Sequence, residues 1–247
     1  MRQILFAAAL ISLLLAACAK APTVPTAVQA SVHFQEGERL FEKGLYPDAI
    51  AAWEKVRESF YSPELNTLVD LKIAEAYFLD GKYIEATAAY ETFLKSNPDH
   101  PRSADVLFQL GLCYQRQMLK ADQDQTMTLQ ALAAFETLLQ RYPLDPRQEE
   151  ARSYIAACLT QLAAHEMVVG EFYLKTGRYQ AAINRFEGVF RRYPAYPDGA
   201  EVYYHLGRSY LLNGDPARSD EAFGLLYQRF PHSKYVAAAE KFIKKNR

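Results

Sequence analysis

The sequence predicts an all-α protein, a superhelical solenoid of about five helix hairpins with a C-terminal capping helix. Two observations lead to this prediction. One arrangement of small, aromatic and helix-breaking residues recurs in the same register along the chain, and the segments that carry it have the apolar spacing of amphipathic helices. Half of the 247 residues are hydrophobic and 23% are charged, a composition that is typical of a packed protein and excludes a disordered one.

The clearest copy of the arrangement covers residues 165–194. Gly170 is small enough to let a second helix come close, and Gly177 tolerates the left-handed backbone conformation with which a helix often ends. Ala182 should face Gly170 from the second helix, and Pro194 ends the copy because proline cannot extend a helix. The segment therefore predicts two short helices folded into a hairpin.

The same positions can be followed along the chain. The small residues of the first helices are Gly37, Ala74, Gly111, Gly170 and Gly207, and the aromatic residues of the second helices are Trp53, Tyr90, Phe135, Phe186 and Phe223. Three of the four intervals between the small residues are 37 residues long. This pattern resembles the tetratricopeptide repeat, whose unit of about 34 residues would here be lengthened in the turn between units.

The amino end predicts a targeting signal rather than a domain. A positive charge precedes an apolar stretch, residues 4–15, that is too short to span a bilayer comfortably. Residues 15–18, LAAC, resemble the lipobox of bacterial lipoproteins, in which the leader is cut before the cysteine. The resemblance implies a signal peptide over 1–17 and acyl chains on Cys18. Ala19 after the cysteine implies the outer membrane.

Three segments are expected after the signal. Residues 18–30 have two prolines and no periodic apolar stripe, so they should form a flexible tether behind the lipidated cysteine. We expect units one to three over 31–143 and units four and five over 144–247.

Two departures from a regular repeat are expected. The polar stretch 120–126 should form a longer loop inside unit three, and 148–174 has no breaker, so it should be one long helix that runs into unit four. The segment 232–246 is amphipathic and should cap the last open face of the array.

No motif for catalysis stands out, which predicts a protein that is not an enzyme and needs no cofactor. P-loop, dinucleotide, HExxH and CxxC patterns are absent, and the five histidines have no metal-ligand spacing, so no metal site is expected. His205 is interpreted as a partly buried aromatic residue. Cys113 and Cys158 lie on apolar stretches as small hydrophobes, with a disulfide as the less favoured alternative. The net charge of -1 gives no general attraction to nucleic acid.

In tetratricopeptide arrays the first helix of each unit lines a concave face. Applied to this sequence, the resemblance implies a peptide groove that is lined by Phe34, Glu38, Phe41, Leu71, Glu75 and Phe78. An apolar groove rimmed by acids could take an extended or helical peptide with aromatic anchors. A neighbouring helix or the tether could equally cover these rings, and both alternatives stay open.

The lipobox, the tether, the five units, the long helix and the segment GEFYLKTGRYQAAINRFEGVFRRYP together resemble the BamD family, lipoproteins of the outer-membrane β-barrel assembly machinery. The most specific part is the NRFEG run, residues 184–188. The resemblance implies that Arg185 binds an acidic residue on the last POTRA domain of a BamA-like insertase, with Asn184 and Glu187 as further residues of that contact. Arg191 and Arg192 close the same helix, where basic residues commonly serve only to oppose the helix dipole.

The resemblance also implies partners and a location. The C-terminal repeats would hold the insertase and other Bam lipoproteins, and the N-terminal repeats would recognise the targeting signal of unfolded outer-membrane proteins, which ends in an aromatic residue. The protein would lie on the outer membrane, facing the periplasm of a Gram-negative bacterium.

Two alternatives come from other classes. A pilotin of type IV pili is also a lipoprotein built from these repeats and would bind a secretin segment, but that class lacks the NRFEG run and the long helix. A cell-wall or divisome-linked periplasmic repeat protein usually has a coiled coil and no lipid.

Overall fold

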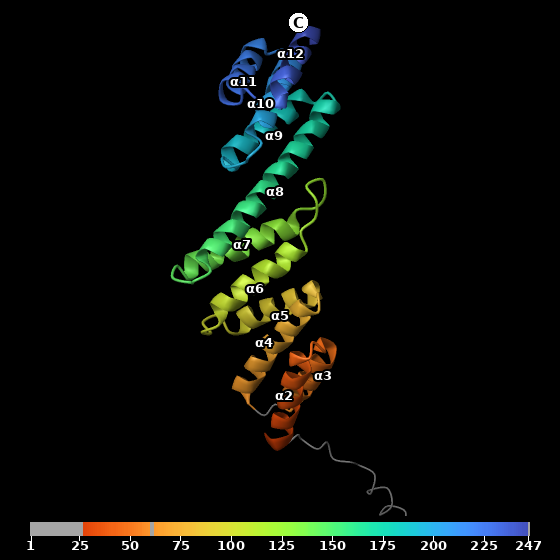
Figure 1. Ribbon diagram of the computed structural model, residues 1–247, viewed down its shortest axis with the longest axis vertical. Helices are drawn as coiled ribbons and strands as arrows, with labels where there is room; N and C mark the ends of the chain where they lie inside the picture. The colour runs from red at the N-terminus through yellow and green to blue at the C-terminus, as the bar shows by residue number, and fades with distance from the viewer. Residues whose placement is uncertain (1–26, 60–61, 247) are drawn as a thin grey trace, which may run out of the picture. The chain divides into compact units, whose positions relative to one another are not determined.

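The computed structural model describes residues 27–59 and 62–246, and all regular structure in these residues is α-helical (Figure 1). The helices are α2 (Ala27–Glu42), α3 (Tyr46–Glu58), α4 (Pro63–Leu79), α5 (Tyr83–Ser96), α6 (Ser103–Arg116), α7 (Thr126–Arg141), α8 (Gln148–Lys175), α9 (Tyr179–Arg192), α10 (Gly199–Leu212), α11 (Pro216–Arg229) and α12 (Lys234–Asn246). The prediction of an all-α repeat fold is confirmed.

The chain forms two compact units, the first ending at Ala76 and the second beginning at Tyr77, so that the division falls inside α4. In the first unit α2 packs against α3 as a hairpin. In the second unit α6 pairs with α7, α8 with α9 and α10 with α11, and each hairpin packs on the next through α7 on α8 and α9 on α10. The predicted grouping of units one to three over 31–143 and units four and five over 144–247 stays a prediction.

In four of the five units an aromatic ring packs on a glycine of the preceding helix. Trp53, Phe135 and Phe186 are completely buried, and their rings lie against Gly37, Gly111 and Gly170 of the preceding helix. A Cβ atom at any of these glycines would fall well inside van der Waals distance of the ring. These three units therefore need a glycine at this position because the ring, rather than the second helix itself, fills the space.

The turn inside each regular hairpin is also made by a glycine. Gly44, Gly81, Gly177 and Gly214 have φ angles of 73°, 76°, 74° and 79°, the left-handed region that L side chains rarely adopt. The Arg178 amide then donates to the Tyr173 carbonyl at 2.9 Å, closing the end of α8. The prediction for Gly177 is confirmed.

Unit three has the longer loop that the sequence predicts, between α6 and α7, and it is tied to the long helix α8. The Gln161 Nε2 atom donates to the Leu119 carbonyl at 2.7 Å, and His165 Nδ1 lies 2.7 Å from the Ala121 carbonyl oxygen. The helix α8 is 28 residues long and unbroken, which confirms the second predicted departure.

The structure corrects one boundary and supports two other predictions. The helix α2 begins at Ala27, so the predicted tether over 18–30 is too long by four residues; alanine and glutamine favour a helix there, and Ala30 is completely buried. The cap α12 packs on α10 and α11. Cys113 and Cys158 are buried free thiols, and burial raises their pKa values to about 12 and about 11.

Replacing Gly170 with alanine is expected to lower the free energy of unfolding by about 1–3 kcal/mol, because the new methyl group overlaps the Phe186 ring. Gly224 on α11 provides the matched control. A Cβ atom there meets nothing within 4 Å, so its replacement by alanine should raise stability by about 0.5–1 kcal/mol. Urea denaturation of both variants measures the difference; equal effects would contradict the packing described here.

Candidate functional site

The NRFEG run lies on α9, where Arg185 takes part in a three-residue ion cluster. Arg185 Nη1 lies 3.1 Å from Glu166 Oε2, and Arg192 Nη2 lies 2.8 Å from Glu166 Oε1. The Glu166 side chain on α8 is only 8% exposed, whereas those of Arg185 and Arg192 are 40% and 49% exposed. The hydrogen bond to Glu166 raises the pKa of Arg185 further above its usual value. The cluster thus holds two half-exposed cations over one buried acid.

Arg185 breaks the internal pattern of the repeat. The residue just before the buried aromatic is Ala52, Ala89, Ala134 and Ala222 in the other four units. An arginine is therefore not required by the packing at this position. Glu166 and the pairing of Arg192 were not predicted, and the interpretation of Arg192 as only a dipole partner was incomplete. The internal comparison of the five units is a signal that would have separated Arg185 from its neighbours.

Glu187, by contrast, follows the repeat. Glu54, Glu91 and Glu136 occupy the same position in units one to three. Tyr210 Oη donates to Glu187 Oε1 at 2.5 Å, and in the same way Tyr114 donates to Glu91. Glu187 therefore joins consecutive hairpins. Asn184 is exposed, and its side-chain oxygen accepts a hydrogen bond from Gln180 at 3.1 Å.

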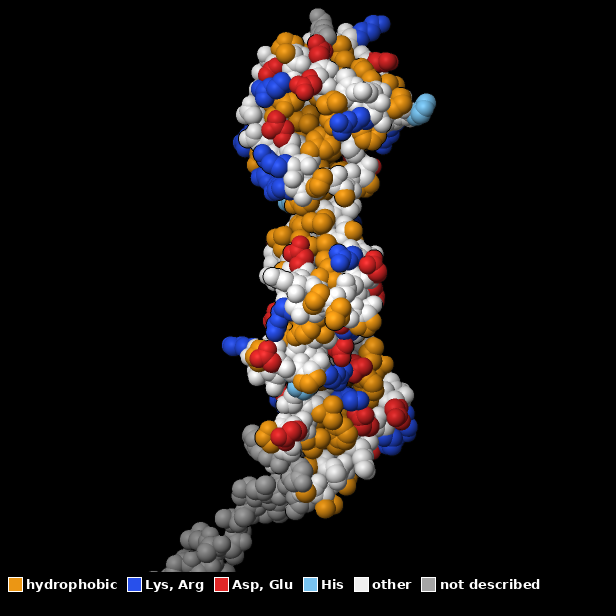
Figure 2. Space-filling view, turned by 90° about the vertical axis from the view of Figure 1, so that its left-hand side faces the viewer, with side chains coloured by type: hydrophobic (Ala, Val, Ile, Leu, Met, Phe, Trp, Pro, Cys, Tyr) orange, Lys and Arg blue, Asp and Glu red, His pale blue; other side chains and the backbone are white. Residues whose placement is uncertain are grey.

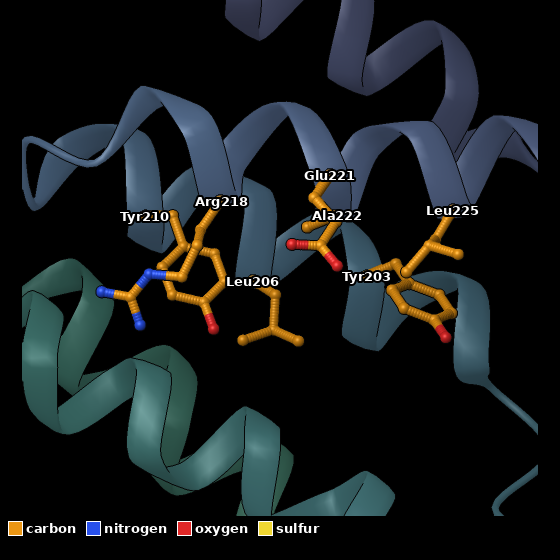
Figure 3. Close-up of a pocket in the computed structure, with 7 residues that line it drawn as sticks. All are labelled: Tyr203, Leu206, Tyr210, Arg218, Glu221, Ala222 and Leu225. Carbon is orange, nitrogen blue, oxygen red and sulfur yellow. The ribbon is translucent and has the colours of Figure 1, made fainter.

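Tyr210 connects Glu187 to a shallow pocket of about 130 Å³ in the last hairpin, which Figure 3 shows. The pocket is lined by Tyr203, Leu206, Tyr210, Arg218, Glu221, Ala222 and Leu225. The Arg218 guanidinium lies 4.7 Å from the centre of the Tyr210 ring. Burial and then the bond to Glu187 raise the pKa of Tyr210 to about 12, so its hydroxyl stays a donor.

A second, more apolar pocket of about 170 Å³ adjoins the ion cluster. It is lined by Ala156, Leu159 and Thr160 of α8 and by Arg192, Tyr193, Pro194, Ala195 and Tyr196 around the end of α9. Arg192 belongs to both features. A cationic cluster beside an apolar pocket suits a protein partner that presents an acidic residue next to a hydrophobic one.

The residues predicted to line a peptide groove fall in both compact units. In the first, Phe34, Phe41 and Glu75 are half-buried, and Lys72 Nζ lies 2.9 Å from Glu38 Oε2. Leu71 is only 3% exposed, so it belongs to the core and does not line a surface. In the second unit, Phe78 is half-buried, with its ring centre 5.5 Å from that of Tyr83.

Cys18 and the predicted signal peptide lie outside the described residues. No helix within residues 27–59 and 62–246 is long and apolar enough to cross a membrane. On the face that Figure 2 shows, acidic and basic side chains are intermixed, with hydrophobic side chains between them.

One group of side chains in the described part of the chain has the spacing of a metal site. Ligand atoms of Glu171, Glu201 and His205, on α8 and α10, all lie within 4.8 Å of one another. Sequence reasoning missed this group because the helices that carry it are brought together only by folding.

Comparison with known proteins agrees with the repeat pattern. A family model described as YfiO, outer membrane lipoprotein, matches residues 26–222. A relative from Caulobacter vibrioides, named outer membrane protein assembly factor BamD, is 27% identical over 97% of this chain and 80% of its own length. Relatives of the same name from Neisseria meningitidis serogroup A (27% identical, 97% of this chain and 95% of the relative) and Rickettsia prowazekii (26%, 85% and 84%) also match.

The similarity to solved structures is weaker than the similarity to the family model. The TPR2AB domain of yeast Sti1, solved in a pHSP90 complex, covers 89% of this chain and 86% of its own, at 12% identity and a TM-score of 0.45. The family model, in contrast, matches most of the chain. The chain therefore belongs to the YfiO family of outer membrane lipoproteins.

Proposed function

We propose that this protein is a lipid-anchored scaffold of the outer-membrane β-barrel assembly machinery. Its relatives are named outer membrane protein assembly factors and match over nearly the whole chain. Its family is one of scaffold proteins rather than enzymes. The comparisons do not favour the alternative, a pilotin for secretin or type IV pilus assembly. The work of such a scaffold is to bind other polypeptides.

The observation that supports this proposal most directly is the partly exposed guanidinium of Arg185. Its guanidinium uses part of its hydrogen-bonding capacity on Glu166 and remains 40% exposed, so other N–H groups can bind a carboxylate of a partner. The buried Glu166 fixes the arginine in place before the partner arrives, which reduces the entropy lost on binding. With two arginines over one acid, the cluster favours an acidic partner, such as a POTRA domain of a BamA-like insertase.

The apolar pocket beside Arg192 would supply the second half of that contact. A protein interface gains most of its affinity from a few well-packed side chains, and a hydrophobic residue of the insertase would fill this pocket. Other Bam lipoproteins would share the C-terminal repeats. Comparison of the repeat units within this chain supports assigning the direct contact to Arg185 and the exposed Asn184. Glu187 would act indirectly, through the packing of α9 on α10.

The N-terminal repeats would receive the targeting signals of unfolded outer-membrane proteins. Phe34 and Phe41 on α2 offer half-buried rings. Lys72 Nζ lies 5.6 Å from the centre of the Phe41 ring, and Glu38 keeps a second carboxylate oxygen without a hydrogen bond. An aromatic chain end would pack on the rings of Phe34 and Phe41, beside the Lys72–Glu38 ion pair.

The anchor has its own test. Replacing Cys18 with alanine is expected to release the protein from washed membranes, because acylation of that thiol would be the source of its membrane affinity. Replacing the buried Cys158 with alanine should leave it in the membrane fraction. Fractionation followed by immunoblotting measures both. A Cys18→Ala protein that stays with the membranes would rule out the lipid anchor.

The experiment for the partner contact is crosslinking in cells. A photoreactive amino acid at the exposed Asn184 should capture a barrel protein with periplasmic domains, identified by mass spectrometry. Ala133 is the matched control, since it is exposed at the same repeat position in unit three. The proposal fails if Asn184 captures no such protein or if both positions capture it equally.

A further inference from the structure

A buried histidine in the last hairpin faces two carboxylates. His205 lies on α10 with its side chain 8% exposed. Its Nε2 atom is 3.7 Å from Glu171 Oε1 on α8 and 4.0 Å from Glu201 Oε1, one turn earlier on α10. These distances are longer than a hydrogen bond. The three side chains therefore converge on one point, and the Nε2 atom makes no hydrogen bond to either carboxylate.

One nitrogen of the imidazole lacks the hydrogen-bond partner that a buried ring nitrogen usually has. Its Nδ1 atom is buried and makes no hydrogen bond. Two aromatic rings contact the imidazole, Phe186 stacked at 5.3 Å and Tyr204 edge to face at 5.1 Å between ring centres. An ion at Nε2 would not change the surroundings of Nδ1, so the three converging ligand atoms, and not this unpaired atom, indicate a bound ion.

The position of Nε2 decides what the ring can do. This atom faces the two carboxylates at 3.7 and 4.0 Å, too far for a hydrogen bond to either. A neutral imidazole can present the lone pair of Nε2 to a metal ion, and the two carboxylates would balance a double positive charge.

We propose that His205, Glu171 and Glu201 form a binding site for a divalent transition-metal ion of the zinc class. Zinc binds imidazole nitrogen and carboxylate oxygen at about 2.0–2.2 Å and commonly takes three protein ligands with one position left open. The ligand atoms here lie within 4.8 Å of one another, so small side-chain rotations would bring them to that distance. Magnesium and calcium prefer oxygen ligands alone, and the imidazole disfavours them.

The surroundings orient the two carboxylates. Lys175 Nζ lies 3.1 Å from Glu171 Oε2, which leaves Oε1 directed at the histidine. Tyr235 of α12 donates a hydrogen bond to Glu201. Outer contacts of this kind fix the ligands of metal sites in proteins. A bound ion would join α8 to α10 and, through Tyr235, to the cap α12, which would stiffen the C-terminal hairpins.

The test is a zinc titration of the full chain in detergent, without a histidine tag and after chelator treatment. Calorimetry with zinc chloride, together with elemental analysis, should find one ion per chain, and zinc should raise the melting temperature. His205→Phe keeps a ring stacked on Phe186 and should abolish binding. Glu171→Gln changes a half-exposed residue and should weaken binding by at least about tenfold.

The exposed His232 provides the control, since His232→Phe should bind zinc like the unmodified chain. Circular dichroism verifies that each variant is helical, and Glu171→Gln keeps the test valid if His205→Phe does not fold. The site is overturned if the unmodified chain binds no zinc, or if a folded Glu171→Gln variant binds it as tightly as the unmodified chain.

Discussion

Replacing Phe186 with alanine is expected to lower the free energy of unfolding by about 3–5 kcal/mol, the largest stability effect that we predict. The ring is completely buried. It packs on Gly170 of α8 and stacks on His205 of α10, so one side chain joins three helices. A cavity at this point removes contacts from all three, and the tight repeat packing leaves little room for relaxation.

Phe172 on α8 is the matched control, because its side chain is 58% exposed. Phe172→Ala should change the free energy of unfolding by only about 0.5 kcal/mol. Urea denaturation followed by circular dichroism gives both values. Comparable losses in the two variants would mean that the repeat core is not organised around the aromatic position.

Reversing the charge of Arg185 is expected to reduce recovery of the partner by at least about tenfold, since attraction to an acidic residue becomes repulsion. Arg185→Glu should also lower the free energy of unfolding by about 1–2 kcal/mol, because the new carboxylate faces the buried Glu166. The cost stays moderate because the side chain is 40% exposed and water screens the repulsion. Co-purification from detergent-solubilised membranes and urea denaturation measure the two effects.

The exposed Arg191 on the same helix controls for the change in net charge. Arg191→Glu alters the charge by the same amount, and recovery of the partner should fall by less than about threefold. If both charge reversals reduce recovery equally, the effect belongs to the overall charge of α9 and not to the residue at position 185.

The fold was largely predictable because its signals are local. In four of the five hairpins a glycine at the end of the first helix and an aromatic residue a fixed distance later specify the turn. The absence of a breaker between Gln148 and Leu174 specifies the long helix α8. The start of α2 was missed because Ala27–Ala30 has no apolar stripe, although Ala30 is buried after folding. Such a boundary depends on tertiary packing more than on the pattern.

The candidate site was only partly predictable, because its contacts join different helices. Arg185 was found through family resemblance, but its partner Glu166 lies 19 residues away on α8. The ligand positions around His205 are also separated along the chain. Leu71 was assigned to a groove from the repeat register alone. Helix α4 buries Val69, Leu71, Ile73, Ala74 and Ala76, so it is covered on more than one side.

The repeat itself supplies a variant that separates binding from folding. Arg185→Ala introduces the residue that the other four units already have at this position, so the free energy of unfolding should change by less than about 1 kcal/mol while Arg192 continues to hold Glu166. The most direct measurement is the affinity of this variant for the purified periplasmic domains of the barrel-assembly partner. We predict binding at least about tenfold weaker than that of the unmodified chain. Equal affinity at equal stability would contradict the role of Arg185 as the partner contact.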